Sequence, residues 1–218
     1  MHLCYCCLDP LTNRNRSAEH IFPSALGGHQ VSYKLLCRLC NVRLGETIDA
    51  ALALRFHETM KSLNVSPDRK NTAGRSARWA AIIYGRFGLG PAGAGSEIGE
   101  AETHQMEEDV RRALCKVAVN TYLHNGGLRS LLDAALISFI NGSSDASGYP
   151  HIKLKDLMSP AQPIHSIRIL SQGNNGQLQA ELTIFGNAYC SLLLNARYQG
   201  PAYEYSYRMD LHRSTGCQ

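Results

Sequence analysis

Two pairs of cysteines near the N-terminus have the spacing of a metal site. Cys4 and Cys7 form one Cys-x-x-Cys pair, and Cys37 and Cys40 form another. Two residues between thiols let one tight turn direct both sulfurs at a single ion, and four thiolates make the tetrahedral shell that selects zinc. A redox dithiol and simple buried thiols are the alternatives. Cys6 could replace Cys4 or Cys7, but only Cys4 and Cys7 repeat the spacing of the second pair. The sequence therefore predicts structural Zn²⁺ at these four cysteines.

The segment between the two pairs places a carboxylate beside an imidazole, at Glu19 and His20, and Asn41 directly follows the last cysteine. Imidazole is a suitable general base near neutral pH. Carboxylate and amide oxygens suit Mg²⁺ or Mn²⁺, which can stabilise charge that develops on a phosphate. These residue types therefore favour hydrolysis of a phosphodiester. Adjacent strand residues point to opposite faces, so Glu19 and His20 share one site only if the backbone bends.

These residues lie in a longer pattern, Glu19-His20-Ile21-Phe22-Pro23-Ser24-Ala25-Leu26-Gly27-Gly28, followed by Leu36-Cys37-Arg38-Leu39-Cys40-Asn41. The pattern resembles the HNH endonuclease family, especially its subgroup with two Cys-x-x-Cys pairs, and covers about residues 4–50. The resemblance implies a ββα-metal fold with His20 as general base. It also implies that Glu19 and Asn41 hold the catalytic Mg²⁺ or Mn²⁺. At the middle position, where the family often has Asn, this chain has Ser32.

Two residues of the following predicted helix are secondary candidates. Asp49 lies about two helical turns beyond Asn41 and is either a further metal ligand, a partner of the ligands or a surface residue. His57 is too distant, at roughly 24 Å along the helix, to bind the same ion. We therefore expect His57 to be a surface or packing histidine.

Two further groups could contact nucleic acid. The basic residues Arg69, Lys70, Arg75 and Arg78 either contact a phosphate backbone or form a solvated loop. The alternating residues Tyr203, Tyr205 and Tyr207 share one face of a predicted strand. They either stack on bases or pack in the core, and we expect packing.

Composition and charge bound the class of protein. Hydrophobic residues make up 44% and charged residues 18% of the 218 residues, as in ordinary soluble proteins. We find neither the roughly 20-residue apolar run of a membrane span nor a signal-peptide core, and expect a cytoplasmic protein with reduced thiols. Residues 1–90 carry 12 Lys and Arg against 6 Asp and Glu, whereas the rest carries 10 against 12. The basic N-terminal part fits a polyanionic partner.

Periodicity predicts an α+β chain. We expect a zinc-stapled ββα-metal module at residues 1–63, ending in a helix over 46–63. Residues 64–101 are expected as a linker, with a polar loop at 64–77, a short helix at 76–87 and a Gly-rich connector at 88–99. An accessory α+β domain at 102–218 follows, with helices at 102–123 and 128–140. Its tail is predicted as an antiparallel meander with strands at 164–171, 178–185, 189–194 and 203–209.

The leading hypothesis from the sequence is a metal-dependent endonuclease that cuts nucleic acid, DNA more readily than RNA. The resemblance implies a setting in bacterial anti-phage defence or a mobile element. Two alternatives stay open: a zinc-stapled module that binds nucleic acid without cleaving it, and a subunit of a complex that needs a partner protein. A homodimer is also open.

Overall fold

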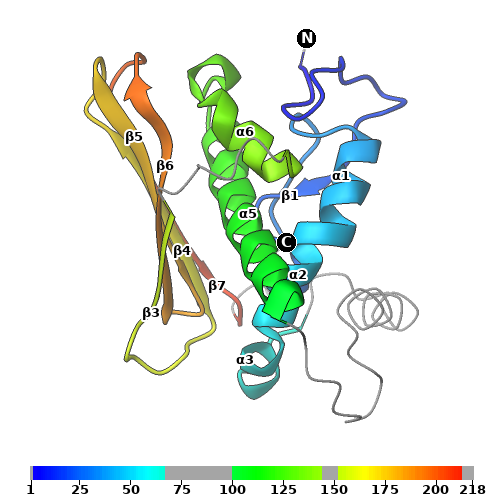
Figure 1. Ribbon diagram of the computed structural model, residues 1–218, viewed down its shortest axis with the longest axis vertical. Helices are drawn as coiled ribbons and strands as arrows, with labels where there is room; N and C mark the ends of the chain where they lie inside the picture. Colours follow the sequence, from blue (N-terminus) through cyan, green and yellow to red (C-terminus); the bar gives the residue numbers. More distant parts are fainter. Residues whose placement is uncertain (1, 67–99, 144–151, 213–218) are drawn as a thin grey trace.

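The computed structural model describes residues 2–66, 100–143 and 152–212, with only the backbone described at 100–103. Three layers are visible in Figure 1: a five-stranded sheet, the long helix α5 (Glu100–His124), and an N-terminal layer of a small hairpin and short helices. The central helix therefore contacts both other layers. This α+β architecture with a β-rich tail confirms the predicted fold class.

The N-terminal layer consists of short elements. Strands β1 (Glu19–His20) and β2 (Val31–Ser32) pair antiparallel, and a 3-10 turn, η1 (Ser24–Leu26), lies between them. Helix α1 (Arg38–Leu44), the π-helical turn η2 (Gly45–Asp49), α2 (Ala50–Arg55) and α3 (His57–Ser62) then follow almost without interruption. Helical structure begins earlier than the predicted residue 46 because the Cys37 sulfur caps α1, accepting from the Cys40 N–H.

Helix α5 confirms the helix predicted over 102–123. Its apolar residues Val110, Leu114 and Val117 are buried and at most 3% exposed. However, α5 is covered on two sides, so polar residues between those positions are buried as well. One of them, Arg112, pairs with Asp109 and donates to two backbone carbonyls at the end of α6 (Ala134–Asn141). Burial of such groups is tolerable when they are paired and hydrogen-bonded.

The predicted helix over 128–140 is divided in two. A 3-10 turn, η3 (Arg129–Leu131), comes first, and α6 begins after two extended residues. The Asp133 carboxylate accepts from the Ala135 N–H and so caps α6 at its N-terminus. Gly142 ends α6 with φ 78°, a left-handed conformation that glycine adopts without steric cost.

The sheet is antiparallel with the order β3-β6-β5-β4-β7. The four predicted strands correspond to β4 (Ile164–Ser171), β5 (Gly176–Ile184), β6 (Ala188–Tyr198) and β7 (Tyr203–Asp210). An edge strand, β3 (Ile152–Asp156), was not predicted, although it alternates apolar and charged residues. On β4 and β5, every second residue is buried. This alternation gives the sheet one face for packing and one polar face.

One hydrophobic core runs through the described residues on both sides of the predicted linker. It extends from Phe22 and Leu26 in the N-terminal layer through Leu114 in α5 to Leu182 in β5. Residues 67–99 lie outside the described residues, so the predicted short helix and connector do too, and the domain boundaries stay a prediction. No helix in the described part of the chain has the length and apolarity to cross a membrane.

Candidate functional site

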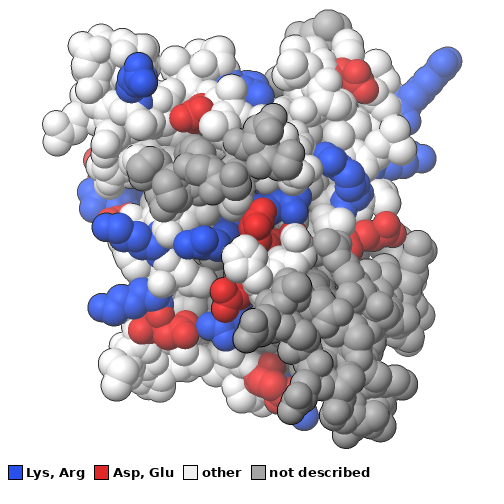
Figure 2. Space-filling view, viewed as in Figure 1, with Lys and Arg blue, Asp and Glu red and all other residues white. Residues whose placement is uncertain are grey.

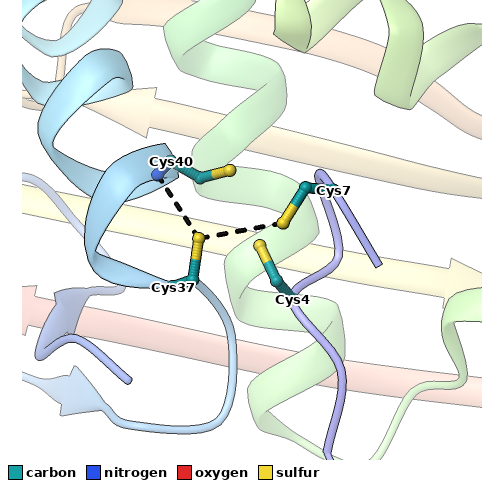
Figure 3. A group of neighbouring side chains, drawn as sticks. All are labelled: Cys4, Cys7, Cys37 and Cys40. Carbon is teal, nitrogen blue, oxygen red and sulfur yellow. Dashed lines mark hydrogen bonds between the residues drawn. The ribbon is translucent and has the colours of Figure 1, made fainter. Parts of the chain in front are cut away.

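The four predicted zinc ligands lie together (Figure 3). Their sulfur atoms are all within 4.8 Å of one another, and the sulfurs of Cys7 and Cys37 are 3.8 Å apart. A zinc ion bonded to four sulfurs at about 2.3 Å separates neighbouring sulfurs by about 3.8 Å. Cys37 and Cys40 come from the start of α1, whereas Cys4 and Cys7 come from the N-terminal loop. The cluster therefore fits a zinc ion that ties this loop to α1.

Cys6 lies beside the cluster without belonging to it. The group that converges on one point contains Cys4 and Cys7 but not Cys6. The Cys6 thiol lowers the pKa of Cys4 to about 4 by a side-chain hydrogen bond, and burial opposes that shift. A lowered pKa favours the thiolate that a metal requires. Cys6 thus acts on a neighbouring sulfur in this structure, and its packing against the hydrophobic core accounts for its partial burial.

Strand β1 directs Glu19 and His20 into different surroundings. Glu19 is 2% exposed and pairs in register with Ser32, whereas His20 is half-buried and pairs with Val31. The bend that would bring both side chains to one face is therefore missing. Asn41 reaches this strand from α1, and its Nδ2 donates to Ser17 Oγ at 2.8 Å and to the Ala18 carbonyl at 3.2 Å. Asn41 thus fixes the residues just before Glu19.

A buried polar cluster surrounds the Glu19 carboxylate. Lys116 Nζ lies 2.7 Å from Glu19 Oε1 and 2.6 Å from Asp49 Oδ2. Asn120 Nδ2 donates to Glu19 Oε1 at 2.8 Å and to the His20 carbonyl at 3.2 Å. Lys116 and Asn120 are one turn apart on α5 and so share one face of that helix. We call Glu19, Asp49, Lys116 and Asn120 the carboxylate–lysine cluster.

Burial and charge act in opposite directions in this cluster. Burial alone lowers the pKa of Lys116, but the carboxylates of Asp49 and Glu19 outweigh it and raise the pKa above its usual value. The amine is therefore held as an ammonium group. Burial raises the pKa of Glu19, and the Lys116 ammonium opposes that shift. The nearby Tyr5 hydroxyl is fully buried, and burial together with surrounding negative charge raises its pKa as well.

The donor set tests whether Glu19 and Asn41 fit a divalent ion. Glu19 Oε1 already accepts from Lys116 and Asn120, whereas Asn41 Nδ2 donates to Ser17 and Ala18, the two residues just before β1. The other candidate, Asp49, directs Oδ2 at the same ammonium. As arranged, the Glu19 carboxylate does not fit a divalent ion, because the ammonium of Lys116 lies where such an ion would contact Glu19 and Asp49.

The structure also places the secondary candidates. His57 lies exposed on α3, with Nδ1 3.2 Å from Glu58 Oε1, as expected for a surface histidine. Ser32 is buried opposite Glu19, and its Oγ accepts from the Lys34 N–H. Tyr203 packs its ring against Tyr122 of α5 with centroids 5.0 Å apart, which confirms the packing expectation for that tyrosine.

Arg69, Lys70, Arg75 and Arg78 lie outside the described residues, but a different basic group is visible on the N-terminal layer. Residues 10–45 contain one acidic residue, Glu19, which is buried. Exposed basic side chains of this stretch are Arg14, Arg16, Lys34, Arg38 and Arg43. The guanidinium of Arg16 lies over the Tyr33 ring, 5.5 Å from its centroid. On the face shown in Figure 2, basic and acidic side chains are interspersed.

Sequence reasoning missed Lys116 and Asn120. They follow Glu19 by about one hundred residues, so no local motif connects them to it. The only available signal was that two polar residues, Lys116 and Asn120, occur four apart within the apolar centre of a helix. Such a pair on a core-facing helix calls for buried partners.

Comparison with known proteins supports the N-terminal assignment. Residues 4–57 match the model of the HNH endonuclease family. No curated protein and no solved structure matches the chain. The matched range contains the four-cysteine cluster, β1 and Asp49. Residues 4–57 of the chain are therefore similar to the HNH endonuclease family, and the same residues contain the cysteine cluster that fits a zinc ion.

Proposed function

We propose that this chain is an endonuclease that hydrolyses phosphodiester bonds in nucleic acid, with DNA as the favoured substrate. The observation that carries the proposal is the coincidence of the family match over residues 4–57 with the convergent four-cysteine cluster. In small, core-poor segments a structural zinc ion contributes folding free energy directly. The zinc cluster and Asn41 would together hold the strand that carries His20.

His20 is the proposed general base. Imidazole can take the proton of an attacking water near neutral pH, which is the first requirement for hydrolysing a phosphodiester. The half-buried position of His20 allows contact with substrate, whereas Glu19 on the same strand is almost fully buried. His20 therefore carries the proposed chemistry, and Glu19 ties the same strand to α5 through Lys116 and Asn120.

The basic residues of the N-terminal layer support a polyanionic substrate. Arg16 is exposed and pairs with Cys37 in an isolated bridge, Lys34 is exposed just after β2, and Arg38 begins α1. Because the acid of this stretch is buried, the exposed charges here are of one sign. Phosphate contacts of this kind supply affinity without sequence specificity.

Mg²⁺ or Mn²⁺ was expected from the resemblance, with Glu19 and Asn41 as ligands. When bound, such an ion would supply charge stabilisation for the leaving oxygen. Since the carboxylate–lysine cluster does not fit that ion, the proposed proton transfer rests on His20. A setting in bacterial defence or a mobile element stays a prediction.

The test compares zinc-loaded wild-type protein with His20→Ala and with His57→Ala, an exposed histidine that serves as the matched control. Plasmid DNA and structured RNA are incubated with each protein, with Mg²⁺, with Mn²⁺ and without added divalent ion, and zinc content is measured afterwards. Cutting that is lost only in His20→Ala supports the proposal and gives the substrate preference. Equal cutting by wild type and His20→Ala rejects His20 as the base.

One observation favours a second candidate, a zinc-stapled module that binds nucleic acid without cutting it. The carboxylate expected to hold the catalytic ion, Glu19, is buried and ion-paired. A protein that binds DNA fully, contains about one zinc ion per chain and does not cut under any condition would support this candidate. Activity that arises only with a co-purifying protein would instead support the partner-dependent subunit.

A further inference from the structure

The carboxylate–lysine cluster joins two layers of the fold that are far apart in sequence. Glu19 comes from β1 and Asp49 from the π-helical turn η2, whereas Lys116 and Asn120 come from α5. The side chains of Glu19 and Lys116 are each 2% exposed, and that of Asp49 is 12% exposed. Groups of opposite charge that are this deeply buried require one another, because each alone would be too costly to desolvate.

We infer that Glu19 and Asp49 form a cation site whose resident cation is the ammonium group of Lys116. The ammonium contacts both carboxylates at hydrogen-bond distance, 2.7 Å and 2.6 Å, as one ion shared between two ligands would. A tethered cation competes strongly with free ions, because its effective concentration is set by the fold rather than by the solution. Lys116 therefore excludes a divalent ion from this pair of carboxylates.

Unpaired oxygens in the same cluster indicate what the site would bind without Lys116. Among the described residues, three buried side-chain oxygens have no hydrogen-bond partner: Tyr5 Oη, Asp49 Oδ1 and Asn120 Oδ1. Two of them belong to the cluster itself. Carboxylate and amide oxygens are the ligands that Mg²⁺ and Mn²⁺ prefer. Removing the ammonium would thus leave two carboxylates and an amide oxygen that suit a hard divalent ion.

The same arrangement gives α5 the role of holding the Glu19–His20 strand. Asn120 contacts both the Glu19 side chain and the His20 carbonyl, so it fixes the backbone from which His20 projects. Lys116 fixes the carboxylate beside it. Lys116 and Asn120 are therefore positioning residues for His20. This role rests on the proposed function, whereas the cation site does not.

The test measures Mn²⁺ binding to zinc-loaded protein by the loss of the free Mn²⁺ signal in electron paramagnetic resonance, which requires no activity. The proteins are wild type, Lys116→Met, Glu19→Gln and the double variant Lys116→Met with Glu19→Gln. Lys116→Met is expected to bind one Mn²⁺ at least about tenfold more tightly than wild type, and Glu19→Gln in the same chain is expected to reverse the gain. Circular dichroism and zinc content establish that each variant is folded.

Two results would overturn the inference. One is a folded Lys116→Met protein with no gain in Mn²⁺ affinity. The other is a wild-type protein that binds one Mn²⁺ at a site that Glu19→Gln abolishes. If Lys116→Met does not fold, the comparison of wild type with Glu19→Gln still decides, since equal Mn²⁺ binding by the two supports a site already filled by Lys116. Failure of the nuclease assay leaves this readout unchanged, so the two proposals fail separately.

Discussion

Acidification should loosen the contact between the N-terminal layer and the sheet through one buried histidine, His165 of β4. Its ring stacks on Phe22 at 5.4 Å with an interplanar angle of 9°, and meets the Phe185 ring edge-on at 4.6 Å. Nδ1 accepts from the Phe185 N–H, and Nε2 lies 3.0 Å from the Leu26 carbonyl as its donor. The neutral ring therefore bridges the two layers, with both nitrogens used.

The size of the expected loss in stability follows from the pKa of the His165 ring. Burial lowers the pKa of His165 from 6.5 to about 4, so between these values the unfolded chain binds the proton that the folded chain excludes. The contribution to stability is complete above pH 6.5 and is lost as the pH falls towards 4. The difference between a pKa of 6.5 and a pKa of about 4 lowers the free energy of unfolding by about 3.4 kcal/mol once the folded protein is protonated as well. About 2 kcal/mol of this stability is lost by pH 5.

Urea unfolding measured from pH 5 to pH 8 would test this reasoning on wild type and on His165→Gln. Glutamine retains a donor and an acceptor but does not titrate in this range. Other titrating groups and the zinc site affect both proteins alike, so the difference between the two profiles isolates His165. We expect wild type to lose about 2 kcal/mol more than the variant between pH 8 and pH 5. Parallel profiles would refute the argument.

Three further outcomes can be measured. Cys37→Ser should lose the bound zinc and unfold at a lower urea concentration than wild type. The midpoint of its urea unfolding should no longer respond to a zinc chelator. A zinc content near one ion per chain in the variant would contradict this expectation. Asn120→Ala should lower kcat of the proposed nuclease about 10–100-fold with little change in KM, because it displaces His20, whereas Asn125→Ala at the end of α5 should not. Arg16→Ala should reduce the salt dependence of DNA binding by about one phosphate contact, and the sheet variant Arg168→Ala should leave it unchanged.

The sequence was sufficient for features that depend on local pattern. The spacing of the cysteine pairs predicted the four-sulfur cluster, and alternation of apolar residues predicted the strands from Ile164 onwards. These features follow from short-range geometry, since a turn or a pleat determines where each side chain points. The edge strand over 152–156 was missed because its charged residues, Lys153 and Lys155, resemble those of a loop as much as those of an exposed edge.

The surroundings of Glu19 could not be predicted in the same way. A Glu-His pair is compatible with two carboxylate environments, an open metal site or a buried ion pair, and the difference is made by Lys116 in another layer. That contact depends on how α5 packs across the hairpin, which a motif of ten residues does not encode. The same holds for His165, whose neutral state results from Phe22 and Phe185 on either side of it.

The N-terminal layer is synthesised before α5, the central helix that covers it. Asn120 leaves the ribosome 101 residues after Glu19, so at about 5–20 residues per second the N-terminal layer waits several seconds for the helix that covers it. During that interval the Glu19–His20 strand lacks both groups that hold it from α5. If cleavage depends on them, a nascent or truncated chain that ends before α5 is inert, and activity begins only after α5 has been made.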